Sequence, residues 1–151
     1  MNSSAYLVFA ILAIAQLGFC DEVNYKDCGS AIGSVNKVSV SGCNKDMSRC
    51  ILKRNTNATV DIEFVANENS NALKSVVHGV VMDVPVPFDL PNDNACSNSG
   101  IECPISSGST YSYLATLPVL KKYPRVTVDI KWELKKDGSD FVCILIPAKL
   151  Q

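Results

Sequence analysis

The chain contains 151 residues, with 14 Lys and Arg against 15 Asp and Glu, seven cysteines and one histidine. The length fits one domain, and a hydrophobic fraction of 47% is too high for a disordered chain. A net charge of -1 without a basic run argues against a nucleic-acid-binding protein, because phosphate binding needs clustered positive charge. A single histidine excludes a His-rich zinc site and a His–His acid–base pair.

An uncharged apolar segment occupies residues 5–19, and Asp21 and Glu22 follow it closely. It has the length of a secretory signal core and is short for a membrane span, which needs about 20 apolar residues. We therefore predict a signal peptide over residues 1–20, cleaved after Cys20, and one mature domain over residues 21–151. A retained membrane anchor is disfavoured by this length and by the lack of flanking Lys or Arg.

Cleavage leaves six cysteines, an even number that is typical of a secreted disulfide framework. Two pairs are close in sequence and could each close a short loop, which leaves the first and last cysteines to pair with each other. Six cysteines allow 15 connectivities, so spacing alone does not choose among them. A zinc site is disfavoured because the chain has no CxxC pair and the histidine is remote from every cysteine. The six are Cys28, Cys43, Cys50, Cys96, Cys103 and Cys143.

The hydrophobic pattern of the mature chain is that of β-strands throughout. Residues 126–134 alternate strictly, with Val126, Val128, Ile130, Trp132 and Leu134 on one face. About seven short strands separated by turn residues predict a β-sandwich or barrel. Two apolar runs, residues 76–82 and 141–146, predict strands buried on both faces. The other predicted strands are residues 35–41, 59–65 and 111–119.

Three prolines alternate with apolar residues in Val84–Pro91, and a similar stretch covers Leu117–Pro124. Proline cannot donate to a β-ladder, so the first segment is either simply a blunted edge strand or the rim of an opening between two sheets. The histidine, His78, is interpreted as a structural strand residue, because no G-x-S-x-G motif or other nucleophile pattern indicates an enzyme. Asn57-Ala-Thr59 is an N-glycosylation sequon, and we expect it to carry a glycan.

Taken together, these motifs resemble those of the ML lipid-recognition family, and within it the small soluble secreted Niemann–Pick type C group, of which we expect an invertebrate member. The resemblance implies an all-β, immunoglobulin-like sandwich of two antiparallel sheets without enzymatic activity or cofactor. It also implies the disulfides Cys28–Cys143, Cys43–Cys50 and Cys96–Cys103. The matching segments are Lys26–Ser30, Val76–Gly79, Val84–Phe88, Cys103–Pro104, Tyr111–Leu114, Leu117–Val119, Tyr123–Pro124, Trp132 and Ile146–Pro147.

Members of this family bind a hydrophobic ligand between the sheets. The resemblance places Phe88, Val119, Tyr123, Pro124 and Trp132 in the pocket; strand alternation adds Val128 and Ile130, and the proline-rich rim adds Val86.

We also predict that Lys121 or Lys122 attracts the carboxylate of a fatty acid at the mouth of the pocket. The expected protein is a monomer, either secreted or in the lysosomal lumen, that carries a fatty acid, a sterol or a similar small lipid or semiochemical. It would pass this ligand to a membrane or a receptor. The alternative is a co-receptor module that presents a bound lipid to a receptor ectodomain.

Overall fold

A computed structural model describes residues 21–151, so the predicted signal peptide, including Cys20, lies outside the described residues. Within this part of the chain every named element is a β-strand, and no helix is long and apolar enough to cross a membrane. The strands are β1 (Lys26–Asp27), β2 (Gly33–Val40), β3 (Cys50–Leu52), β4 (Thr56–Ala66), β5 (Lys74–Val81), β6 (Val84–Pro87), β7 (Thr110–Val119), β8 (Thr127–Lys136) and β9 (Ser139–Leu150).

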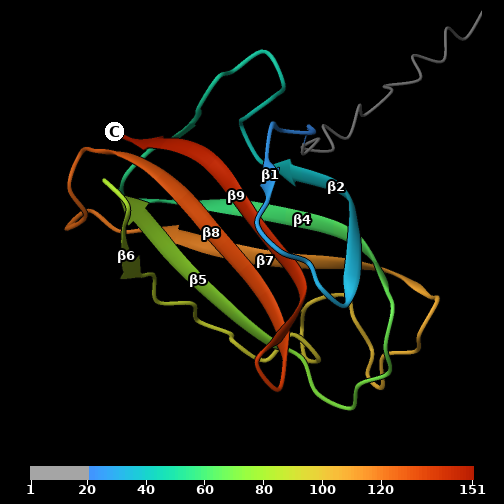
Figure 1. Ribbon diagram of the computed structural model, residues 1–151. Helices are drawn as coiled ribbons and strands as arrows, with labels where there is room; N and C mark the ends of the chain where they lie inside the picture. The colour runs from blue at the N-terminus through green and yellow to red at the C-terminus, as the bar shows by residue number, and fades with distance from the viewer. Residues whose placement is uncertain (1–20) are drawn as a thin grey trace, which may run out of the picture.

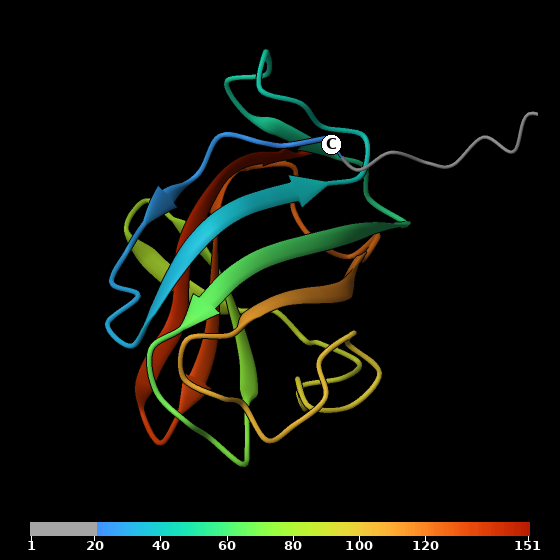
Figure 2. The same ribbon diagram turned by 90° about the vertical axis from the view of Figure 1, so that its right-hand side faces the viewer.

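The strands form two sheets that pack face to face, and this confirms the predicted sandwich (Figures 1 and 2). The larger sheet has the order β1-β9-β8-β5-β6, with β3 also paired to β9, and the smaller sheet has the order β2-β4-β7. All pairs are antiparallel except β3 with β9. Figure 2 shows β2, β4 and β7 as one layer, with the long strands of the larger sheet behind it.

The alternating sequence of β8 explains why one face of this strand is buried in the core and the other points away from it. Val128, Ile130, Trp132 and Leu134 alternate onto the inner face, and each is at most 2% exposed. Opposite them across the ladder, β9 places apolar partners on the same face, for example Ile144 beside Trp132. A shift of one residue would turn this whole apolar set to solvent, so burial fixes the register.

The two strands predicted to be buried on both faces behave differently. In β9 the prediction for residues 141–146 is confirmed except at Leu145, which is half-buried; the other five residues are buried. For β5 it is wrong: Val77 and Gly79 are buried, but Val76, His78 and Val80 on the outer face are only half-buried. Among the described residues no second layer covers this outer face of β5, so its valines and histidine keep contact with solvent.

The proline-rich segment forms β6, an edge strand that pairs only with β5, as predicted. A two-residue turn joins β5 to β6, and both of its residues have positive φ, 49° at Met82 and 65° at Asp83. Two such residues are typical of the primed turns that match the twist of a hairpin. The predicted strand over residues 76–82 therefore ends at Val81, one residue early.

The three predicted disulfides, Cys28–Cys143, Cys43–Cys50 and Cys96–Cys103, are all confirmed. Cys28–Cys143 joins residues 115 apart in the sequence and fastens the N-terminal segment to β9. Beside it, the Cys28 N–H donates to the Cys143 carbonyl at 2.8 Å. Closing so long a loop lowers the conformational entropy of the unfolded chain. In the chain-entropy model this stabilises the folded protein by about 4–5 kcal/mol.

Candidate functional site

A small apolar cavity opens at one end of the sandwich, against the inner face of the larger sheet. We call it the mouth cavity. Its volume is about 100 Å³, and its walls come from β5, β6, β8, the end of β9 and the loop between β7 and β8. The lining residues are Gly79, Val81, Val86, Pro87, Phe88, Tyr123, Pro124, Val126, Val128 and Leu150.

An aromatic pair, Phe88 and Tyr123, forms one wall of the mouth cavity. Their ring centroids are 5.0 Å apart and the rings meet edge to face at 76°. Phe88 lies directly on the backbone of β5, because a β-carbon on Gly79 would come within 2.6 Å of Phe88 Cε2. It would also lie 3.1 Å from Val128 Cγ2. Glycine is therefore the residue that lets the aromatic pair close over this strand.

Burial, together with the neighbouring Asp89 carboxylate, raises the pKa of Tyr123. The phenol is thus neutral at physiological pH, and it contributes an apolar ring with a polar tip to the mouth.

Deeper in the sandwich lies a second, much smaller void of about 10 Å³, which we call the inner void. It follows the mouth cavity along the same strands: Val128 and Leu150 line the mouth cavity, whereas Ile130 and Ala148, the next inward residues, line the inner void. Both sheets contribute, and every lining side chain is apolar or a disulfide cysteine. The lining residues are Val40, Cys50, Leu52, Ala58, Val60, Leu117, Ile130, Ile146 and Ala148.

Beyond the inner void the core is filled. Trp132, the next inward residue of β8, is fully buried, and its ring meets that of Tyr113 at a centroid distance of 5.9 Å. The Tyr113 hydroxyl is 2.7 Å from Ser75 Oγ, a buried hydrogen bond between the two sheets. Burial raises the pKa of Tyr113, so this hydroxyl stays protonated. These residues form a closed floor beneath the two hollows.

The structure brings together Val86, Phe88, Tyr123, Pro124 and Val128 of the predicted pocket residues, all at the mouth cavity. Ile130 lines the inner void instead. Val119 and Trp132 are buried core residues that line neither hollow.

Five lining residues were absent from the sequence-based set. Val126 continues the alternation of β8, and Val81 lies two residues after Gly79, so periodicity could have identified both. Leu150 follows from the pairing of β9, where its N–H donates to the Val126 carbonyl at 2.9 Å. The complete set is Gly79, Val81, Pro87, Val126 and Leu150.

The charged and modifiable residues lie outside the cavity. Lys121 and Lys122 are exposed in the loop that leads to Tyr123. Asn57 is exposed on β4, where it pairs with Pro118 of β7. Its exposure leaves room for a glycan on this side of the smaller sheet.

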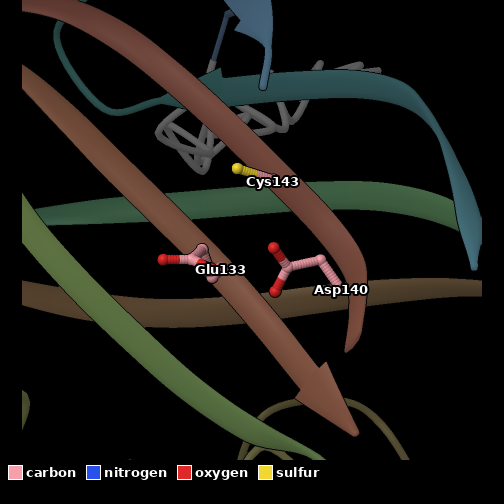
Figure 3. Close-up of side chains that lie close together, drawn as sticks. All are labelled: Glu133, Asp140 and Cys143. Atoms are coloured by element: carbon pink, nitrogen blue, oxygen red, sulfur yellow. The ribbon is translucent and has the colours of Figure 1, made fainter. Parts of the chain in front are cut away.

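Three potential metal ligands, Glu133, Asp140 and Cys143, meet on the outer face of the larger sheet (Figure 3). The cluster is explained without a metal ion, because the Cys143 sulfur is bonded to Cys28. In addition, Lys135 Nζ lies 2.7 Å from Glu133 Oε2 and 2.9 Å from Asp140 Oδ1. One ammonium therefore bridges the two carboxylates.

The two carboxylates titrate in opposite directions. Burial and the adjacent Glu133 raise the pKa of Asp140 and outweigh the attraction of Lys135. Burial also acts to raise the pKa of Glu133, but hydrogen bonds from Lys135 and Asp140 and the charge of Lys131 lower it overall. The contact between the two carboxyl groups thus moves their pKa values apart, upward for Asp140 and downward for Glu133.

We predict that Asp140→Asn leaves the protein as stable as the wild type at pH 4 and more stable at pH 7. Because the pKa of Asp140 is raised on folding, its contribution to stability falls as pH rises through the window from its unfolded to its folded value. An asparagine imitates the protonated form at every pH. Urea denaturation at both pH values measures the difference, and a variant that is less stable at pH 7 than the wild type would contradict this account.

A second prediction concerns Gly79→Ala. The new methyl group collides with Phe88 Cε2, and Phe88 must rotate away from Tyr123. We expect the ring resonances of both residues to shift in NMR spectra and the melting temperature to fall. The free energy of unfolding should decrease by about 1–3 kcal/mol. Adding Phe88→Leu removes the colliding ring edge, so the double variant should be less destabilised than the sum of the single variants. Additive effects would show that Gly79 and Phe88 act independently.

Comparison with known proteins places the chain in one family. The ML domain profile matches residues 22–150. The chain is 48% identical over 143 residues to the ecdysteroid-regulated 16 kDa protein of Manduca sexta, covering 95% of each chain. It is 45% identical over 147 residues to NPC intracellular cholesterol transporter 2 homolog a of Drosophila melanogaster, covering 96% of this chain and 99% of that protein.

A solved structure agrees with these sequence matches. The crystal structure of a Niemann-Pick type C2 protein from Japanese carpenter ant superposes with a TM-score of 0.80 at 28% identity, covering 85% of this chain and 100% of that one. The fold, the three disulfides and these similarities agree, and the chain belongs to the ML-domain family.

Proposed function

We propose that the protein is a secreted carrier that holds a hydrophobic ligand, a fatty acid, sterol or similar small lipid, in the mouth cavity. The observation that carries the proposal is the mouth cavity itself, an opening lined by apolar and aromatic side chains at one end of the sandwich. Membership of the ML-domain family supports it, as does the similarity to proteins named as cholesterol transporters. The proposal assigns no reaction to the protein.

The ligand must enlarge the cavity as it enters. About 100 Å³ is well below the roughly 300–1,000 Å³ of small-molecule pockets. The inner void, which lies just beyond Val128 and is lined by residues of both sheets, supports enlargement at this position. A ligand that joins the two hollows would extend along β8 past Ile130 and stop at Trp132. We therefore expect the sheets to separate slightly when the ligand binds.

The expected affinity follows from burial of the ligand. Each CH₂ group transferred from water contributes about 0.8 kcal/mol, so a long acyl chain contributes on the order of 10 kcal/mol. Loss of translational and rotational freedom costs about 4–15 kcal/mol. The balance favours micromolar or somewhat tighter binding, which permits release as well as uptake.

Mass spectrometry of the protein secreted from insect cells tests the proposal. We expect the native spectrum to show a lipid adduct that disappears on denaturation, with a mass that separates a fatty acid from a sterol. The denatured mass reports cleavage after Cys20, three disulfides and a glycan on Asn57 at the same time. A protein that carries no adduct, and gains none from added oleate or cholesterol, would refute the carrier function. The co-receptor alternative would then require a receptor ectodomain that binds this protein.

The mouth carries charges of both signs, and they predict a preference among headgroups. Lys121 and Lys122 precede Tyr123 in the loop and would attract a carboxylate, whereas Asp89 follows Phe88 and would repel it. All three side chains are exposed, so each contributes only about 0–1 kcal/mol. Such charges bias selectivity and do not create affinity.

We predict that replacing both lysines with Gln weakens binding of the fatty acid cis-parinaric acid by up to about fivefold for each lysine that attracts the carboxylate. Binding of the uncharged sterol dehydroergosterol should stay unchanged, because no carboxylate is involved. Asp89→Asn is the control of opposite sign and should strengthen cis-parinaric acid binding. Fluorescence titrations measure all three, and equal changes for both ligands would exclude a role for these charges.

The rim of the mouth suggests where the ligand leaves. Met82 is 92% exposed, and Val84 and Val86 beside it are also exposed on the β5–β6 hairpin. Exposed apolar residues next to a lipid-binding cavity fit hand-off to a membrane or to a receptor that covers the mouth. In the predicted setting, outside the cell or in the lysosomal lumen, the protein would act as a monomer.

A further inference from the structure

An arginine outside the ligand cavity holds the loop that closes it. Arg54 lies in the turn between β3 and β4, and its Nη1 donates to the Lys121 carbonyl at 2.9 Å and to the Tyr123 carbonyl at 3.2 Å. We call the segment of residues 120–126 the mouth loop; it contributes Tyr123, Pro124 and Val126 to the cavity wall. The Nε of Arg54 is buried without an acceptor in the described part of the chain. Arg54 is half-buried, and its guanidinium lies against the loop.

The turn that carries Arg54 is itself firmly attached. The Arg54 N–H donates to the Gln151 carbonyl at 2.7 Å, and the Gln151 N–H donates back to the Leu52 carbonyl at 3.0 Å. Asn55 N–H donates to the Val119 carbonyl at 2.6 Å, just before the mouth loop begins. Arg54 thus connects a well-anchored part of the larger and smaller sheets to a loop with few contacts of its own.

The mouth loop depends on this connection. Its internal hydrogen bond joins the Tyr123 N–H to the Leu120 carbonyl at 3.1 Å, and Val126 is fixed by Leu150 of β9. Within the loop, Arg54 binds the carbonyls of Lys121 and Tyr123, on either side of Lys122. Hydrogen bonds from a charged donor are among the stronger ones in proteins. Loss of the guanidinium would free the segment whose aromatic ring packs on Phe88.

We propose that Arg54 is a positioning residue that slows release of the ligand by holding Tyr123 in the closed wall of the mouth cavity. The inference rests on the proposed carrier function. Its route is indirect: Arg54 holds the loop, the loop holds Tyr123, and Tyr123 packs against Phe88 over Gly79. Because Arg54 does not line the cavity, its removal should change the lifetime of the complex and not the apolar surface that the ligand contacts.

The chain offers a matched control in Arg49. Its Nη1 also donates to a backbone carbonyl, that of Ala148 at 3.3 Å, and to Asp129 Oδ1 at 3.0 Å. Arg49 lies next to β3, as Arg54 does, but it makes no hydrogen bond to the mouth loop. Arg49→Met and Arg54→Met remove the same charge and keep a similar aliphatic stem. A nonspecific effect of charge or stability should appear in both variants.

The test uses the full mature protein and two measurements. Stopped-flow transfer of cis-parinaric acid and of dehydroergosterol to excess acceptor vesicles gives the dissociation rate. We expect Arg54→Met to raise it about tenfold for both probes, equivalent to about 1.4 kcal/mol, with a nearly unchanged association rate. Arg54→Lys, which retains a charged donor, should restore part of the difference. It also keeps the test available if Arg54→Met does not fold. Arg49→Met should release both probes at the wild-type rate.

Hydrogen–deuterium exchange of the ligand-free protein separates the inference from the carrier function. Faster exchange at residues 121–125 in Arg54→Met, but not in Arg49→Met, would support loop positioning. Unchanged exchange there would refute it, and faster exchange with an unchanged dissociation rate would refute control of release. If the wild type binds neither probe, the proposed carrier function is refuted. The hydrogen–deuterium exchange of residues 121–125 then tests by itself whether Arg54 positions the loop.

Discussion

The rest of the structure depends on a packing constraint at one end of the sandwich. Protein interiors are normally filled by their own side chains, and a sandwich core is about 10 Å thick. Here the core is filled from the far end as far as Trp132, but not completely beyond it, where the inner void and the mouth cavity lie. A void forfeits the dispersion contacts of the atoms that line it, so the unfilled end lowers the stability of the empty protein. A ligand that fills this space would restore those contacts.

Such a core needs a frame that stays folded while one end is incomplete. The Cys28–Cys143 disulfide ties the N-terminal segment to β9, and the buried hydrogen bond between Ser75 and Tyr113 joins the two sheets at the filled end. The ion-pair cluster around Lys135 lies near that end as well. These three contacts therefore stabilise the filled end, and the floor keeps its shape.

The sequence predicted the strands and the disulfides well, but it predicted the lining of the cavity less completely. Strict alternation identified β8, and prolines identified the β6 edge, because both signals depend on local backbone physics. The outer face of β5 was misjudged, since a run of valines looks the same whether or not a second layer covers it. Val119 and Trp132 were placed in the pocket by resemblance; both are buried, and neither lines the mouth cavity or the inner void. Whether an inward residue meets another side chain or a void depends on packing between distant strands, which periodicity does not report.

The walls of the mouth differ in how easily they can move. Val128 and Leu150 belong to long strands at the centre of the larger sheet, and displacing them would break ladders on both sides. In contrast, β6 has only β5 as a partner, its four residues are exposed, and its two prolines donate no hydrogen bonds. The facing wall is the mouth loop, which has no ladder at all. Opening of the mouth would therefore separate Phe88, which follows β6, from Tyr123 of the loop. Gly79 leaves the space on β5 that Phe88 occupies in the closed arrangement.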